Sequence, residues 1–146
     1  MPQLRTKGQI EAEISDAMVR LHREQTGRGP NQARAYIVED LIIVRLQEVL
    51  TPAERQLTGN PHGQSLIKQF HQQMHEIARR SLEQIIESAT GCRVTSIHND
   101  VSTKTGEQVA IYVLDHNLEA LLFRRSTEGA AAPRKVSPQS NDSPPD

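Results

Sequence analysis

The fold is decided by residues 27–57, which read GRGPNQARAYIVEDLIIVRLQEVLTPAERQL. Residues 34–38 and 41–46 are rich in β-branched and large apolar side chains, and only Glu39 and Asp40 separate them. Such runs favour strands, and Asp tolerates the backbone conformations of turns. We therefore predict a β-hairpin that turns at Glu39-Asp40. One long strand with a bulge at the acidic pair is the alternative.

Helices are predicted on both sides of this hairpin. Between residues 8 and 25, apolar side chains recur at helical intervals, and Gly27 can adopt the left-handed conformation that ends a helix. After the hairpin, residues 51–54 read TPAE, with a capping threonine, a proline at the first helical position and an acid at the end of the first turn. This pattern predicts a short helix over residues 52–57.

A longer amphipathic helix and a second hairpin follow. Residues 58–63, TGNPHG, form a polar break, and apolar side chains then recur with helical spacing over residues 64–89. Residues 93–101 and 108–114 have strand character, and the polar residues 102–107 join them. The order helix, hairpin, helix, hairpin suggests an αββ unit used twice. We predict an α+β fold whose antiparallel sheet is covered on one face by two main helices.

One domain is expected, because a chain of 146 residues matches the commonest domain size. We assign this domain to residues 8–125, with a flexible N-terminus at residues 1–7 and a last helical turn or two at residues 117–125. Residues 126–146 contain four prolines and almost no large apolar side chain. This Pro/Ser-rich tail is therefore predicted to be disordered.

The balance of charge disfavours nucleic-acid binding. The chain has 17 Lys and Arg against 18 Asp and Glu, so its formal charge is −1 and it has no global positive field for phosphate backbones. A nucleic-acid-binding regulator that uses Arg79-Arg80 is retained only as a further alternative. No apolar run approaches the roughly 20 residues that span a bilayer, so no transmembrane segment is expected.

A cytoplasmic location is expected from the N-terminus and the cysteine content. The first residues lack the apolar stretch of a secretory signal, and the single Cys92 cannot form an internal disulfide. One cysteine likewise cannot make a cysteine-rich zinc site. We predict no resident metal and no cofactor.

Two pairs of polar residues support an alternative hypothesis, a small enzyme or metal-binding protein. His71 and His75 lie four residues apart on the long predicted helix, a spacing that can place two imidazoles on one metal. The helical wheel puts His71 beside the apolar stripe and turns His75 further toward water. His98 and Asp100 share one face of a predicted strand, but no nucleophile elbow or oxyanion hole accompanies them.

Six polar residues are the candidates for binding a ligand or a partner. Arg28 and Gly29 form a small turn whose backbone amides and guanidinium suit an anion, although no strand precedes it and no GKS or GKT follows. Asp40 stands at the predicted hairpin tip, and Arg45 lies in an otherwise apolar strand, where a structural ion pair is favoured over a substrate clamp. The set is Arg28, Gly29, Asp40, Arg45, His98 and Asp100.

Four segments together resemble a known family. They read KGQIEAEISDAMVRLHREQTGRGP, ARAYIVEDLIIVRL, LTPAE and HNDVSTKTGEQVAIYVLD, and they span residues 7–115. They resemble the MpsC-like family of small bacterial proteins, which is named for its association with a sodium-translocating, membrane-potential-generating system. The resemblance implies a cytoplasmic accessory of ion or inorganic-carbon transport, and it transfers no catalytic residues.

We accordingly expect a non-enzymatic accessory or regulatory protein that binds a partner or a small ligand. A membrane transport protein is the expected external partner, because translocation itself needs a polypeptide that spans the bilayer. An exposed strand edge invites pairing with another chain. We therefore also expect a homodimer, formed by edge-to-edge pairing of the sheet.

Overall fold

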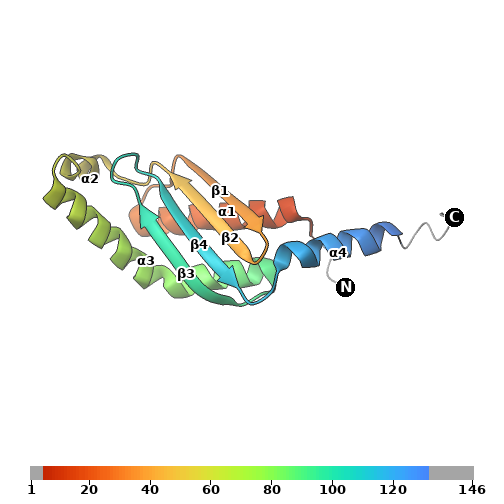
Figure 1. Ribbon diagram of the computed structural model, residues 1–146. Helices are drawn as coiled ribbons and strands as arrows, with labels where there is room; N and C mark the ends of the chain where they lie inside the picture. Colours follow the sequence, from red (N-terminus) through yellow and green to blue (C-terminus); the bar gives the residue numbers. More distant parts are fainter. Residues whose placement is uncertain (1–4, 132–146) are drawn as a thin grey trace.

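The computed structural model describes residues 5–131 of the chain. In Figure 1 its strands form one sheet, the long helices α1 and α3 lie on the same side of that sheet, and α4 projects from one end. In chain order, the elements are α1 (Lys7–Thr26), β1 (Gln32–Val38), β2 (Leu41–Gln47), α2 (Pro52–Leu57), α3 (Pro61–Thr90), β3 (Val94–Val101), β4 (Gln108–Leu114) and α4 (Leu118–Ala131).

The two hairpins join into one antiparallel sheet through their second strands. β2 pairs with β4, so the strand order is β1-β2-β4-β3. The predicted α+β fold, an antiparallel sheet with two main helices on one face, is confirmed. The αββ repeat stays a prediction, because the second hairpin has a longer connection and β3 shifts register between Val94 and Ser96.

The first hairpin turns at Glu39 and Asp40, as predicted, and the alternative of a single bulged strand is wrong. Glu39 has a φ of 56°, in the left-handed region that favours glycine. Bonds from outside the hairpin hold this turn: the Glu39 N–H donates to Glu119 Oε1 at 2.9 Å, and the Asp40 carbonyl accepts the Leu114 N–H at 2.8 Å. These bonds offset the strain of a non-glycine residue in this conformation.

Capping residues set the helix boundaries. Thr6 Oγ1 accepts the Gln9 N–H at 3.1 Å, and the Gln9 side chain accepts the Thr6 N–H in return. α1 then ends at Gly27, whose φ of 78° is left-handed as predicted. α2 spans the predicted residues and begins with the same reciprocal bonds between Thr51 and Glu54.

α3 begins at Pro61 rather than at residue 64, so half of the predicted polar break is helical. Asn60 caps this start, since its Oδ1 accepts the Gly63 N–H at 2.8 Å. An Asn-Pro pair suits both a turn and a capped helix start, and the structure uses the second.

α4 is longer than the turn or two predicted for residues 117–125. It continues to Ala131, into the segment predicted as a tail. The rest of that segment, residues 132–146, lies outside the described residues, as do residues 1–4 of the predicted flexible N-terminus.

The core lies between the sheet and the two long helices. Alternate residues of the two central strands point toward the helices and are buried, and the helices contribute one apolar stripe each. Each fully buried aliphatic side chain stabilises the fold by roughly 1.5–3 kcal/mol. The buried residues that build this layer include Ile10, Ile14 and Met18 of α1, Ile42 and Val44 of β2, Ile67, Leu82 and Ile86 of α3, and Tyr112 of β4.

Candidate functional site

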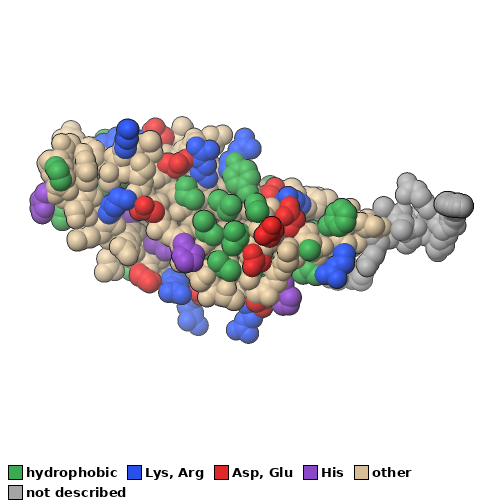
Figure 2. Space-filling view, in the orientation of Figure 1, with side chains coloured by type: hydrophobic (Ala, Val, Ile, Leu, Met, Phe, Trp, Pro, Cys, Tyr) green, Lys and Arg blue, Asp and Glu red, His purple; other side chains and the backbone are tan. Residues whose placement is uncertain are grey.

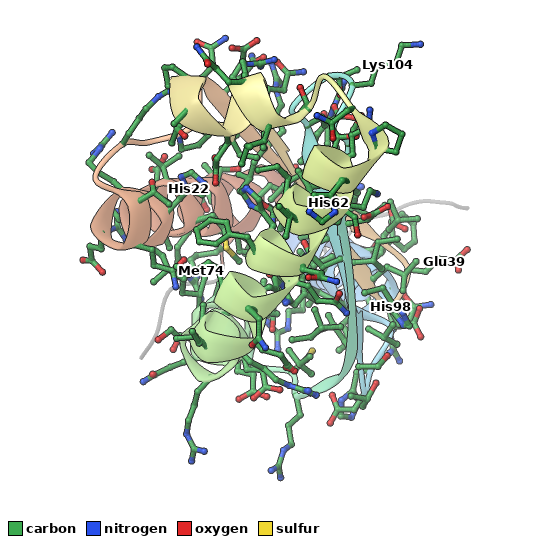
Figure 3. All side chains as sticks on the ribbon, turned by 90° about the vertical axis from the view of Figure 1, so that its left-hand side faces the viewer. His22, Glu39, His62, Met74, His98 and Lys104 are labelled. Carbon is green, nitrogen blue, oxygen red and sulfur yellow. The ribbon has the colours of Figure 1, made fainter. Side chains whose placement is uncertain are left out.

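A pocket of about 60 Å³ opens between α1, α3 and the side of the sheet that faces the helices. Met18 and Met74 belong to its largely apolar wall, and three histidines line it: His22 of α1, and His71 and His75 of α3. In Figure 3, His22 and Met74 lie in the helix layer, whereas the labelled strand histidine lies on the opposite side of the molecule. The pocket is therefore a feature of the helix layer.

His71 is the buried polar side chain of this layer, with 7% of its surface exposed. Its Nε2 lies 3.3 Å from Glu54 Oε2, so the carboxylate is the polar partner of the ring. Burial lowers the pKa of His71, and the Glu54 carboxylate opposes this effect through its charge and a hydrogen bond. Burial therefore favours the uncharged form of the imidazole at neutral pH.

Glu54 is held in place by the start of α2. Its Oε1 accepts the Thr51 N–H at 2.8 Å, while Thr51 Oγ1 accepts the Glu54 N–H at 3.2 Å. Its second carboxylate oxygen is the one that faces His71. The capping box that begins a helix thus also fixes a carboxylate beside the pocket.

His75 follows His71 by one helical turn and is half-buried, so it lies further toward water than the buried His71, as the helical wheel predicts. Its Nε2 is buried and has no hydrogen-bond partner among residues 5–131. His22 belongs to the other wall of the pocket, on α1, and its Nδ1 lies 3.1 Å from the Arg28 carbonyl oxygen. Burial lowers the pKa of both histidines, and for His22 the Arg28 carbonyl acts in the opposite direction.

An apolar pocket with uncharged imidazoles is suited to binding a small molecule that has hydrogen-bonding groups. A neutral imidazole offers a donor at one nitrogen and an acceptor at the other. The volume of about 60 Å³ leaves room for a few water-sized groups. His71 and His75 belong to the lining that such a molecule would meet.

The pocket histidines do not gather around a common metal position. Within residues 5–131, one group of three potential ligands has its atoms within 4.8 Å of one another, namely Cys92, Asp115 and His116. Asp115 Oδ1 lies 2.7 Å from His116 Nδ1 and accepts the Arg93 N–H at 3.0 Å. This group joins the end of α3 to the end of β4 and is separate from the pocket.

Of the six residues proposed from the sequence, Arg28 and Gly29 lie closest to the pocket. They belong to the loop between α1 and β1, and the Arg28 Nη1 donates to the Leu50 carbonyl at 3.5 Å. A Cβ atom on Gly29 would lie 3.2 Å from the Arg23 guanidinium, so this turn is packed against α1. Its contribution to the pocket is the Arg28 carbonyl that positions His22.

Asp40 and Arg45 lie away from the pocket. Asp40 is half-buried at the hairpin tip. Arg45 is exposed on β2 and forms an ion pair with Glu107, which raises the pKa of Arg45. Arg45 therefore takes part in the kind of structural ion pair that the sequence favoured.

His98 and Asp100 are both exposed on β3, with one residue between them. Asp100 forms a salt bridge of 2.9 Å with Lys68 of α3, and this hydrogen bond lowers the pKa of Asp100. The His98 ring contacts Ser96, whose Oγ lies 3.4 Å from His98 Nε2. The structure does not bring the six candidate residues together into one site.

Sequence reasoning missed the pocket residue His22 and also Glu54, which lies beside His71. A weak signal existed for each: His22 directly follows the apolar stripe residue Leu21, and Glu54 was noted only as a helix-capping acid. The spacing of His71 and His75 singles out two side chains of the pocket lining, but as a possible metal site. What the sequence could not show is that α1 and α3 enclose a pocket with the sheet, or that α2 brings Glu54 beside His71.

Comparison with known proteins gives consistent matches along most of the chain. The family model described as "Na+-translocating membrane potential-generating system (MpsC)" matches residues 6–116. The uncharacterized protein YbcI of Bacillus subtilis is 38% identical over 115 residues, which cover 79% of this chain and 93% of YbcI. The uncharacterized protein YrhF of the same organism is 18% identical over 108 residues, 73% of this chain and 88% of YrhF.

Two further findings concern solved structures and membrane-spanning helices. No solved structure matches the chain. None of the helices within residues 5–131 combines the length and the apolar character needed to cross a membrane.

Proposed function

Because the chain belongs to the family of the Na+-translocating membrane potential-generating system (MpsC), we propose that it is a non-enzymatic accessory or regulatory protein of ion or inorganic-carbon transport. It binds a small ligand in the histidine-lined pocket and acts on a membrane-embedded partner from the cytoplasm. The observation that supports ligand binding most directly is the buried Nε2 of His75, which has no hydrogen-bond partner among residues 5–131.

Leaving the pocket empty costs free energy, because a buried polar atom then lacks a hydrogen bond. A buried donor or acceptor without a hydrogen bond costs about 1–3 kcal/mol. A ligand that bonds to His75 recovers part of that free energy on binding. Since burial lowers the pKa of both rings, the ligand meets neutral imidazoles, which favours a small uncharged or weakly polar molecule over a strongly charged anion.

The role in transport rests on the family match and on general membrane physics. An ion crosses the bilayer only through a polypeptide that spans it, with its backbone groups satisfied internally. None of the described helices can do so. The role we propose is accordingly that of a protein that binds to such a polypeptide.

Deletion of the gene in its native cell tests this role. The expected result is a smaller Na+-dependent membrane potential, measured with a voltage-sensitive dye in media that contain either Na+ or K+. Re-expression of the full chain is expected to restore the potential. An unchanged potential in Na+ medium after deletion would contradict the proposed role.

A second candidate function, metal binding, is favoured by the group formed by Cys92, Asp115 and His116. Thiolate, imidazole and carboxylate are the side-chain ligands of protein zinc sites, where water can complete the coordination. Elemental analysis of the purified chain and a thermal shift with zinc chloride test it. Bound zinc and a shift that Cys92→Ser abolishes are expected, whereas neither bound zinc nor a shift would exclude this function.

A further inference from the structure

The side of the sheet opposite α1 and α3 is apolar along its middle. The solvent-facing side of an antiparallel sheet is ordinarily polar. Here Tyr36 and Val38 are 39% and 41% exposed, and Figure 2 shows hydrophobic side chains gathered in one patch over the strands. A contiguous apolar patch of this kind marks an interaction surface. The patch, called the open face below, consists of Tyr36, Val38, Leu41, Ile43, Val109, Ile111 and Val113.

The strand register makes the open face continuous across three strands. Tyr36 pairs with Ile43, and Ile43 pairs with Ile111, which gives one row across the middle of the sheet. The neighbouring row toward the hairpin turn is apolar too, because Val38 pairs with Leu41. Directly opposed side chains on neighbouring strands lie close enough to pack.

Opposite charges lie at the two ends of the open face. At one end Arg34 pairs across the strands with Arg45, and only Arg45 has an acidic partner within the described residues, Glu107. At the other end, the turn residues Glu39 and Asp40 have no basic partner among residues 5–131. In Figure 3, Glu39 points outward from the sheet side of the molecule. The surface therefore has an unneutralised basic end and an unneutralised acidic end.

The chain segment outside the structure does not match this surface. Residues 132–146 contain a single large apolar side chain, Val136, and four charged side chains, Arg134, Lys135, Asp142 and Asp146. Covering an apolar sheet face requires several apolar side chains at spaced positions. A second copy of the chain supplies them, because an isologous interface presents the same patch twice.

We propose that the open face is the interface of a homodimer, in which two sheets pack face to face about a two-fold axis that runs across the strands. This axis reverses the strand direction between the copies. The basic end of one open face, with Arg34, then lies over the acidic end of the other, with Glu39 of the partner subunit. Tyr36, Ile43 and Ile111 form the apolar centre of the interface.

The edge-to-edge pairing expected from the sequence is disfavoured at β1, one of the two edge strands of the sheet. At the outer edge of β1, the Ile37 N–H already donates to Glu11 Oε2 of α1 at 2.9 Å, which removes one of the groups that a paired strand would need. Three strands about 4.8 Å apart and seven residues long give about 340 Å² per copy. A total of about 700 Å² is below the size of stable specific interfaces, so we expect a weak dimer with a dissociation constant in the high micromolar range.

Sedimentation equilibrium of the full chain tests the proposal over low to high micromolar concentrations. The wild-type chain is expected to shift from 16.3 kDa toward twice that mass as concentration rises. Tyr36→Asp, at an exposed position of the open face, is expected to weaken the dimer by more than about 30-fold, as for a central aromatic contact. Ile43→Asp is expected to act in the same direction, and circular dichroism establishes that each variant is folded.

Ile77→Asp is the matched control, because Ile77 is 74% exposed on α3, away from the open face. It is expected to leave the association constant unchanged. A wild-type chain that stays at 16.3 kDa at every concentration would overturn the proposal. Two other results would overturn it as well. One is a folded Tyr36→Asp variant that dimerises as strongly as the wild type, and the other is an Ile77→Asp variant that dimerises more weakly than the wild type.

The orientation of the two copies has its own test. Arg34→Glu and Glu39→Arg, made singly, each place like charges together and are expected to weaken the dimer by up to about fivefold, as for exposed ion pairs. The double variant is expected to recover most of the wild-type affinity. Additive losses in the double variant would exclude the axis across the strands.

Discussion

At the scale of single residues, burial controls the charge of the pocket. His22, His71 and His75 come from two helices, yet burial lowers the pKa of all three. Each ring is more readily protonated in the unfolded chain, where its pKa is near 6.5, than in the folded chain. The histidine-lined pocket therefore couples the stability of the fold to pH.

The sign of this coupling gives the first prediction. As pH falls from about 7.5 toward about 5, the unfolded chain takes up protons before the folded chain does, so the free energy of unfolding decreases. Urea denaturation at a series of pH values measures this slope. The slope is expected to become shallower in His75→Phe, which removes one of the three rings. A free energy of unfolding that rises as pH falls through this range would contradict the prediction.

A second prediction concerns His75 itself. Its Nε2 is buried without a hydrogen-bond partner, so replacement of the ring by an apolar ring of similar size removes a desolvation cost. His75→Phe is expected to be as stable as the wild type or more stable at neutral pH in thermal and urea unfolding. His62→Phe, at an exposed position of the same helix, is the control. A clearly destabilised His75→Phe variant would show that the ring makes a bond that the account omits.

At the scale of elements, α2 and the start of α3 form a tight corner. A Cβ atom on Gly63 would lie 1.7 Å from the Leu57 carbonyl oxygen, so only glycine allows these two helices to approach as they do. The approach keeps α2, and with it Glu54, beside His71 of α3. The corner thus positions the carboxylate that lies beside His71.

Gly63→Ala is expected to destabilise the protein by about 1–3 kcal/mol, because the backbone must shift to relieve the overlap. Gly59→Ala is the matched control, since a Cβ there would meet nothing closer than the Gln56 carbonyl oxygen at 3.9 Å. Urea denaturation compares the two variants. Equal stabilities would mean that the α2–α3 corner is not tightly packed.

The capping box of α2 gives a further prediction at this scale. Thr51→Ala removes the hydroxyl that accepts the Glu54 N–H and is expected to cost about 1 kcal/mol of stability. A looser Glu54 carboxylate also opposes the lowering of the His71 pKa less strongly. The His71 pKa, followed by NMR titration of its ring protons, is expected to fall further in Thr51→Ala. An unchanged or higher His71 pKa would contradict the link between the cap and the pocket.

At the scale of the whole molecule, the local sequence pattern predicts the helices and strands better than it predicts the histidine-lined pocket. Both hairpins and α2 were predictable, because β-branched runs, the Glu39-Asp40 turn and the TPAE cap are local signals. The start of α3 was not, since its Asn60-Pro61 pair suits a turn as well as a helix. The pocket depends on how α1 and α3 pack on the sheet, and no spacing within one element specifies such packing.

The apolar character of the open face likewise becomes clear only from the packing of the whole molecule. Alternation within a strand predicts that one side is buried, and here the strands are apolar on both sides. A strand that is apolar on both sides indicates two packing partners. One chain supplies the first partner, the helix layer, and the proposed second copy supplies the other.

The most direct test of the account is the Na+-dependent membrane potential of cells that lack the gene and re-express one variant at the wild-type level. His62→Phe, outside the pocket, is expected to restore the potential as fully as the wild-type chain does. His75→Phe, which is expected to fold stably but to lose a ligand-binding nitrogen, is expected to leave the potential low. Full restoration by His75→Phe would contradict the claim that this protein acts through its histidine-lined pocket.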